Sequence, residues 1–442
     1  MKRAAGLVVA LFTSLIAVAS AFGQSAELQR WISSAPKIPA DEAIRRALQT
    51  SSLTVDGSPF HAILDISEPE DKNSPYQGSI EIFWANSLKY RTVLRTKSFQ
   101  QTRVVNGKEI EETDSGDFYP AWLRNYLRAL MDPLSMATLF EGNNAPVMLG
   151  AHVSSCIRRD DRLGGITNLM TWAEICFQGT EPSIKSVDDF TYFMEFGDYR
   201  PFEKKVVARS YTNYTDDNQK IIGKLTKLEA LPVNDESLFE IKNPTPLSQQ
   251  IKTQFVSSKE GETLLTSSPK ITWPPVREGK TKGNIVVHVI ADRTGQVREA
   301  YKYNSDNPSL EDFGVEQALQ LKFMPLLING EPVQMETPLV LHFSTKIGVP
   351  LPIITGNDIE KYATGCGYNP TLPKGLLPSG TTFKIRVSVN EKGEDTGEIF
   401  PSNIPWNVIQ MAQLKPMDCK FKPYIVDGKP SYHHIDFTFT AP

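Results

Sequence analysis

The sequence predicts an α+β protein: a curled antiparallel sheet, or open barrel, with helices, followed by two small α+β domains. Two observations lead to this prediction. Apolar and polar residues alternate with a period of two along much of residues 79–105, as they do in half-buried antiparallel strands. A motif in the C-terminal half occurs twice, 98 residues apart, which is typical of a duplicated structural unit.

The repeated motif is Lys-Phe-x-Pro followed by Gly-x-Pro. The first copy occupies residues 322–332 and the second occupies residues 420–430. Two pairs upstream keep the same offset of 98: Val289 with Val387, and Gly295 with Gly393. We therefore expect one domain at residues 271–347 and a second copy of it at residues 366–442. No catalytic residue type is common to both copies, which favours binding over chemistry.

The length and composition are those of an ordinary globular protein with several domains. A chain of 442 residues is too long for a single core. Hydrophobic residues make up 40% of the chain and charged residues 22%, which argues against a disordered or fibrous protein. The formal net charge of −4 gives no reason to expect nucleic acid as a partner.

Residues 1–23 are predicted to be a secretory signal peptide. Lys2 and Arg3 precede an apolar stretch that runs from residue 4 to residue 19, and Ala21 and Gly23 offer small residues for cleavage. The alternative is an uncleaved membrane anchor, which is disfavoured because the apolar stretch is shorter than a typical span. We therefore expect the mature chain to be exported.

The four cysteines fit an oxidising compartment. Cys156 and Cys176 lie close together in the first half of the chain, whereas Cys366 and Cys419 bracket most of the second repeat. All four are expected to form disulfides. Three connectivities are possible, and pairing within each domain needs no contact between domains. A metal or redox site is the alternative, and the lack of a CxxC spacing disfavours it.

Residues 24–245 are expected to form the sheet domain. Residues 79–84 and 88–95 are predicted as two strands joined by a tight turn. Residues 99–105 continue the sheet and turn at Asn106-Gly107, the strongest short hairpin signal in the chain. Further strands are expected around Cys156 and Cys176, at residues 205–214 and at residues 220–228.

Two amphipathic helices are expected in the same domain. Residues 40–50 follow Pro39, and residues 119–131 end before Pro133. The apolar face of the first helix consists of Ala43, Ile44, Ala47 and Leu48. The apolar face of the second consists of Trp122, Leu123, Tyr126, Leu127 and Leu130. These helices are expected to cover one face of the sheet.

A long curled sheet leaves an apolar cavity when helices do not fill its concave side. Four aromatic residues are candidates for the lining of such a cavity: Trp84, Tyr90, Trp122 and Tyr126. The alternative is that these residues are plain core, since half-buried sheets and helices need large apolar side chains in any case.

Parts of this domain resemble the LolA/LppX-type envelope fold. The resemblance lies in a glycine-led strand at residues 78–84, Lys89-Tyr90-Arg91 at the start of the next strand, and the Asn-Gly turn within residues 104–108. Leu238-Phe239 followed by Asn243-Pro244 resembles the end of that family's domain. The resemblance implies an unclosed β-barrel that holds lipid acyl chains or another apolar ligand.

Residues 246–270 are polar and are predicted to be a linker. The first repeat is expected to contain strands at residues 285–290 and 297–303, a helix at 310–322 and a final strand at 339–344. The second repeat is expected to contain a strand at residues 383–389, a helix at 406–415 and a final strand at 434–440. A glycine in the first turn of each copy can supply a positive φ.

This order of elements resembles the TonB C-terminal domain. Its most recognisable stretch, Phe-x-Pro followed by Asn/Asp-Gly-x-Pro, spans residues 323–332 and 421–430. The usual Tyr-Pro before the first strand is replaced by Trp273-Pro274. The proline-rich spacer and membrane helix of an energy transducer are missing from this sequence. The resemblance therefore implies the fold and the binding of an outer-membrane receptor segment, without energy transduction.

Residues that could carry chemistry favour a structural role. His433 and His434 could ligate a metal, but adjacent residues of a strand point to opposite faces of the sheet. The carboxylates of Glu68, Glu70 and Asp71 lie in a polar turn, which offers neither burial nor a fixed partner. No nucleophile–base or metal-binding pattern is visible. We therefore expect a protein that is not an enzyme and uses no metal or cofactor.

These features predict a binding protein of the bacterial periplasm, with association with the outer membrane and a role in transport as further expectations. Its repeats would add an extended segment of an envelope protein as a strand to a sheet edge. The last strand of each repeat is the expected edge, with four candidate contact residues: Leu341, Phe343, Ile435 and Phe437. The alternative is a carrier or sensor of lipid or another apolar ligand in the open barrel.

Overall fold

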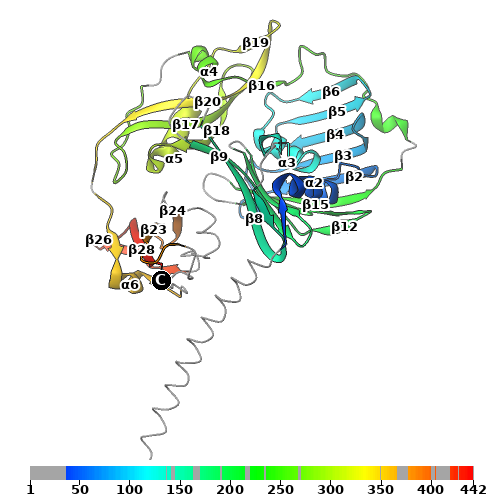
Figure 1. Cartoon of the computed structure of the whole chain (residues 1–442). Helices are drawn as coiled ribbons and strands as arrows, with labels where there is room; N and C mark the ends of the chain where they lie inside the picture. Colours follow the sequence, from blue (N-terminus) through cyan, green and yellow to red (C-terminus); the bar gives the residue numbers. More distant parts are fainter. Residues whose placement is uncertain are drawn as a thin grey trace, which may run out of the picture. The chain divides into compact units, whose positions relative to one another are not determined.

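The computed structural model describes most of the chain after residue 35 (Figure 1). The described ranges are 36–135, 137–140, 145–162, 170–189, 192–214, 220–232, 235–266, 270–348, 350–365, 377–399, 404, 419–426 and 428–441. The predicted signal peptide, Cys366 and the helix expected at residues 406–415 lie outside them. The larger of two compact units contains the described residues of Trp31–Pro274 and Gly279–Thr345, and the smaller contains those of Pro275–Glu278 and Lys346–Pro442.

An antiparallel sheet of 11 strands forms most of the larger unit (Figure 1). Its order is β6 (Glu109–Ser115), β5 (Gln100–Asn106), β4 (Lys89–Thr96), β3 (Gly78–Asn86), β2 (Phe60–Ser67), β15 (Lys220–Ala230), β14 (Ser210–Tyr214), β11 (Phe193–Gly197), β10 (Ser183–Asp189), β9 (Met170–Gly179) and β8 (Gly150–Arg162). The sheet curls into a half-barrel, as the sequence predicts. Strand β15 pairs with β2 along eight residue pairs, so the two ends of the domain sequence meet in the middle of the sheet.

The hairpins predicted within β3–β6 are present. Asn86 pairs with Lys89 across the first turn, and Asn106 pairs with Glu109 across the third. Gly107 has a φ of +67°, which explains why the Asn-Gly turn needs glycine. Alternating burial along β3 confirms the period of two, because Ile80, Ile82 and Trp84 are buried and their neighbours are less so.

The two predicted helices of this domain are confirmed as α2 (Ala40–Ser51) and α3 (Ala121–Met131). α3 begins two residues later than expected because Pro120 adopts an extended conformation at its N-cap. Both helices lie against the concave face of the sheet (Figure 1). Shorter elements complete the domain: β1 (Lys37–Pro39), η1 (Ala137–Phe140), β7 (Pro146–Met148), β12 (Arg200–Phe202), β13 (Lys205–Val207) and η2 (Glu236–Phe239).

A disulfide joins two neighbouring strands at one edge of the large sheet. Cys156 of β8 and Cys176 of β9 are direct cross-strand partners, with an S–S distance of 2.00 Å. This confirms the predicted pairing of these two residues. Cys419 is also disulfide-bonded. Its expected partner, Cys366, lies outside the described residues, so the second pairing stays a prediction.

The two C-terminal repeats have sheets with the same strand order, as expected for a duplication. In the first, the order is β16 (Thr253–Phe255), β20 (Glu331–Ser344), β17 (Lys282–Ala291) and β18 (Val297–Ser305), and β19 (Leu326–Ile328) pairs with β20. In the second, the order is β21 (Ile353–Thr355), β28 (His433–Thr440), β23 (Thr382–Val389) and β24 (Asp395–Ile399). Other elements are α4 (Ser258–Leu264), η3 (Pro308–Leu310), α5 (Glu311–Leu319), η4 (Gly356–Asp358), α6 (Ile359–Tyr362), β22 (Ala363–Thr364), β25 (Lys420–Phe421), β26 (Tyr424–Val426) and β27 (Lys429–Ser431).

The segment expected to be a linker, residues 246–270, instead contributes to the first repeat. β16 pairs in parallel with β20, and α4 follows it with a capping box formed by Ser257 and Glu260. Leu265 then pairs with Phe323, just as Ala363 pairs with Phe421 98 residues later. The segment is polar because β16 is short and largely exposed, so hydrophobic periodicity could not reveal it.

The last strand of each repeat is not a sheet edge, which corrects the prediction. β20 lies between β16 and β17, and β28 lies between β21 and β23. Farther along β20, the indole Nε1 of Trp273 donates a hydrogen bond to the carbonyl oxygen of His342 at 3.0 Å. The four residues proposed as edge contacts are all buried: Leu341, Phe343, Ile435 and Phe437. Among the described strands of these sheets, the outermost ones on the other side are β18 and β24.

The Phe-x-Pro motif and the first turn contact each other in both repeats. Gly295 has a φ of +83°, and its carbonyl accepts a hydrogen bond from the amide of Phe323 at 2.8 Å. A Cβ atom at Gly295 would lie 2.0 Å from the carbonyl oxygen of Phe323. Gly393 also has a φ of +83°, and a Cβ there would lie 2.7 Å from the carbonyl oxygen of Phe421. The repeated residues therefore fix one tertiary contact twice.

Replacement of Gly295 by alanine should destabilise the first repeat far more than replacement of Gly330. Both glycines have a positive φ, but nothing lies within 4 Å of a Cβ built at Gly330. We expect Gly330→Ala to cost about 1 kcal/mol and Gly295→Ala at least about 2 kcal/mol more, because only the latter collides with backbone. Native-state hydrogen exchange of β17 measures the difference, and equal losses would contradict this account of the turn.

Candidate functional site on the concave face of the sheet

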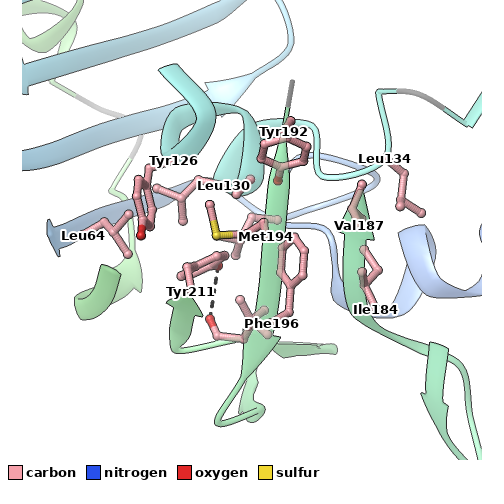
Figure 2. Packing of buried hydrophobic residues seen from close by; sticks show 14 of the residues in the cluster. Leu64, Tyr126, Leu130, Leu134, Ile184, Val187, Tyr192, Met194, Phe196 and Tyr211 are labelled. Carbon is pink, nitrogen blue, oxygen red and sulfur yellow. Dashed lines mark hydrogen bonds between the residues drawn. The ribbon is translucent and has the colours of Figure 1, made fainter. Parts of the chain in front are cut away.

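The concave face of the large sheet and the two helices against it share one apolar core. Figure 2 shows Leu64, Tyr126, Leu130, Met194 and Tyr211 packed together, from strands β2, β11 and β14 and from α3. α2 contributes a face of small side chains, in which Ala40, Ala43 and Ala47 are fully buried. These contacts are almost entirely apolar, so the helices are held on the sheet mainly by the hydrophobic effect.

Three tyrosines on the concave side of the sheet donate hydrogen bonds from their hydroxyl groups to backbone carbonyls. The hydroxyl of Tyr126 donates to Ile221 at 2.7 Å, and that of Tyr211 donates to Ala208 at 3.2 Å. Tyr199 donates to the carbonyl of Ile184 at 2.5 Å. Burial raises the pKa of all three phenols, so they stay neutral at any physiological pH. They act here as hydrogen-bond donors that orient the helix and strands.

A glycine in the sheet makes room for α3. A Cβ atom at Gly223 of β15 would lie 2.8 Å from the ring of Tyr126 and 3.1 Å from the side chain of Leu64. The ring of Tyr126 therefore lies directly on the backbone of the sheet. This explains how a helix with a large aromatic side chain can approach the strands closely.

The four aromatic residues proposed as a cavity lining lie in the packed core. Trp84, Trp122 and Tyr126 are 5% exposed or less, and Tyr90 packs against the same cluster. The rings of Trp84 and Tyr90 are stacked with centroids 5.2 Å apart, and Trp122 meets Tyr76 edge-on at 5.9 Å. Trp122 and Tyr126 belong to α3, and they pack with α2 and the sheet in one apolar cluster. This arrangement matches the alternative interpretation, in which the four aromatic residues belong to the hydrophobic core.

A small pocket lies where the C-terminal ends of α2 and α3 meet the sheet. Its lining comes from both helix ends and from β10, β11 and β14: Ser51, Ser52, Leu53, Ala129, Leu130, Pro133, Ile184, Phe196, Tyr199, Ala208 and Tyr211. Two serines lie at one side of an otherwise mainly apolar lining. Sequence reasoning missed this site because its residues come from distant segments, and no motif links them.

A second, more polar pocket lies beside the loop that follows α2. Lys205 lines it together with Asp56, Gly57 and Glu203. The Nζ atom of Lys205 donates hydrogen bonds to the carbonyls of Gln49 at 2.9 Å and Val55 at 2.5 Å. Burial lowers the pKa of Lys205. This lysine satisfies a free carbonyl in the last turn of α2 and ties the helix end to β13.

The outer side of α3 contacts the sheet of the first repeat. Arg124 donates a hydrogen bond to the Glu336 carboxylate at 2.7 Å, and the amide of Ala121 donates to Glu299 at 2.8 Å. His288 approaches Glu336 at 3.3 Å. Although burial opposes ionisation, the contacts with His288 and Arg124 lower the pKa of Glu336 to about 2. Burial raises the pKa of Glu299 to about 7.

The residues considered for metal binding or acid–base chemistry have other contacts. His433 lies against the rings of Tyr362 and Tyr424, whereas the Nδ1 atom of His434 is 3.2 Å from the Ser388 hydroxyl. These neighbours therefore lie on opposite faces of the sheet, as predicted. In the acidic turn, the side chain of Asp71 accepts a hydrogen bond from the amide of Asn73 at 2.8 Å. Glu68 is buried, while Glu70 and Asp71 are exposed.

Comparisons with known proteins give weak structural likenesses. The chain is similar to a LolA superfamily protein from Nitrosomonas europaea, with 7% identity and a TM-score of 0.23, over 46% of this chain and 98% of that one. It is similar to a domain from Vibrio parahaemolyticus, provisionally assigned as an outer-membrane lipoprotein-sorting protein, with 8% identity and a TM-score of 0.23, over 45% of this chain and 95% of that one. No family model matches the chain, and no curated protein matches it.

None of the helices in the described ranges is long and apolar enough to cross a membrane. The predicted signal peptide lies outside these ranges, so export stays a prediction.

Glu299 should make the stability of the larger unit depend on pH. Its pKa is raised from 4.5 to about 7, with Arg124, Tyr301 and Glu336 as its charged or titratable neighbours. The folded state therefore holds a proton that the unfolded state loses above pH 4.5. The resulting stabilisation is complete below that pH and is lost as the pH rises to about 7.

We expect the free energy of unfolding of the wild-type protein to fall by roughly 1–3 kcal/mol relative to Glu299→Gln across this range. Glutamine keeps the acceptor for the Ala121 amide and cannot ionise. Urea denaturation of both proteins at intervals from pH 4.5 to pH 8 measures the difference. A constant difference would show that Glu299 does not titrate in this window.

Proposed function

We propose that the larger unit binds the acyl chain of a lipid, or another elongated apolar ligand, between the concave face of the sheet and helices α2 and α3. The observation that carries the proposal is the small pocket between the ends of both helices and the sheet. Ile184 and Phe196 offer contacts for a chain, and Ser51 and Ser52 offer hydrogen-bond partners for a polar end.

Ligand entry requires the helices to move, because the interior of the half-barrel is packed. When a helix moves away from the sheet, its apolar contacts are lost. A ligand chain that takes its place buries apolar surface in turn, which offsets most of the lost free energy. A polar contact between α3 and the large sheet is the hydrogen bond from Tyr126 to the carbonyl of Ile221. A cover held mainly by apolar contacts is therefore suited to reversible opening.

In this proposal the protein is a carrier or sensor that acts in the periplasm and catalyses no reaction. It needs no cofactor, because apolar burial supplies the binding free energy. The resemblance of residues 78–108 to the LolA/LppX-type fold is consistent with such a role.

The direct test is native mass spectrometry of the protein purified from its own periplasm, followed by organic extraction. A bound lipid or other apolar molecule would support the proposal. For an empty protein, titration with the fluorescent probe 1-N-phenylnaphthylamine tests whether the site can be filled.

Replacement of Ala208 by leucine should weaken probe binding at least about tenfold, because the larger side chain fills the pocket between the helix ends. The matched control is Ser58→Leu, which adds the same side chain at the polar pocket. Fluorescence titration measures both variants. Equal affinities in the two variants would contradict the assignment of the site.

A second candidate function is peptide binding by strand addition to the second repeat. β24 pairs with β23 on one side and is outermost in the described sheet. The same sheet already has a short strand, β21, added in parallel beside β28. An outermost strand can accept an extended segment through main-chain hydrogen bonds. By the TonB resemblance, the segment would belong to an outer-membrane receptor or another envelope protein.

Photo-crosslinking in the periplasm tests strand addition. We expect benzoylphenylalanine at position 398 of β24 to crosslink an envelope protein, and the same residue at position 361 of α6 to give no such product. Lys361 is exposed and lies on a different element, so it controls for random encounter. The same product from both positions would exclude β24 as the binding edge.

A further inference from the structure

We infer that the sheet of the first repeat is a latch on α3: it binds the outer side of the helix that covers the concave face and thereby controls whether that face can open. The inference rests on the proposed function for its consequence, but the latch itself is a physical contact within the larger unit. It can be tested whether or not a ligand binds.

α3 has two buried sides with different partners. Its inner side packs on the concave face through Trp122, Tyr126 and Leu130. The turn at its N-terminus packs on the first repeat, where Phe118 and Ala121 form an apolar cluster with Ile290 of β17. The helix therefore cannot leave the concave face while its other side stays bound to the repeat.

Polar contacts at the N-terminus of α3 fix its position against the repeat. Gln334 is fully buried, and its side chain both accepts from the amide of Tyr119 at 3.0 Å and donates to the carbonyl of Tyr119 at 2.9 Å. The carboxylate of Glu299 accepts from the amide of Ala121, one of the free N–H groups in the first helical turn. Each of these hydrogen bonds to the start of α3 would be lost if the helix moved away, which makes partial opening costly.

An ion pair adds to the contact between α3 and the first repeat. Arg124 is 2.7 Å from Glu336, and both side chains are largely buried, with exposed fractions of 23% and 16%. Arg298 of β18 also pairs with Asp117 just before the helix, at 3.0 Å. Removal of one member of a buried pair leaves the other charge without its partner, so the pair resists separation.

The second repeat has different residues at the corresponding positions. With the offset of 98, Gln334 corresponds to Tyr432 and Glu336 to His434. Ile290 corresponds to Ser388, so the apolar contact is replaced by a hydroxyl group. The contacts that hold α3 are therefore specific to the first copy and are not a general property of the duplicated fold.

Hydrogen–deuterium exchange of the full chain tests the latch. In the Glu336→Gln variant we expect the amides of α3 to exchange roughly tenfold faster than in the wild type. The reason is the loss of a charge-assisted hydrogen bond that holds the helix. The amides of α2 should be unchanged, because α2 does not touch this contact. The matched control is Glu331→Gln, an exposed glutamate at the start of the same strand, which should leave α3 unchanged.

The single variant could misfold because it leaves the charge of Arg124 unpaired. The double variant Arg124→Gln with Glu336→Gln removes both charges of the ion pair. Circular dichroism checks that each variant is folded. Unchanged exchange in α3 of both folded variants would overturn the latch. The rate of 1-N-phenylnaphthylamine uptake is measured separately. Faster exchange with an unchanged uptake rate would overturn the control of access, whereas absence of uptake in every protein would overturn the proposed function and leave the latch standing.

Discussion

The apolar concave face of the large sheet must be shielded from water, and the rest of the larger unit follows from this constraint. A sheet of 11 strands that does not close into a barrel exposes a wide apolar surface on its inner side. α2 and α3 cover this surface with small and aromatic side chains, respectively. Gly223 lets the ring of Tyr126 lie on the sheet, so the cover is close-packed at its centre. The pocket at the helix ends is one place where this packing is incomplete.

Much of the first domain could be predicted from the sequence because its local signals agree with its tertiary structure. The alternation along residues 79–105 marks strands with one buried face, and the turn at Asn106-Gly107 fixes their register. The helices were predictable for the same reason: each has an apolar face that packs on the concave face of the sheet. Strand order could not be predicted in full, because the pairing of β15 with β2 joins segments about 160 residues apart in sequence, and no local pattern records it.

The candidate site was harder to predict than the fold. Trp84 and Trp122 are large aromatic residues on a buried face, and the sequence alone does not reveal whether such a face meets a ligand or a helix. The pocket itself is lined by residues of no special type, such as Ala129 and Ala208. The strand β16 was missed for a related reason: it is short and exposed, and only the capping box at Ser257 gave a local sign that the segment is ordered.

The two repeats have the same strand order but differ on the outer face of their sheets. In both copies the inner face of the sheet is apolar, and the Phe-x-Pro motif meets the same glycine turn. The outer face differs. In the first copy Ile290 is fully buried beneath the start of α3, whereas at the corresponding position in the second copy Ser388 contacts His434. Arg386 on that face pairs with Asp436 at 2.6 Å and with Glu278 at 3.6 Å, so its charge is paired without a neighbouring helix. The copy that binds α3 has thus become part of the larger unit, while the other retains a sheet whose outer face is polar.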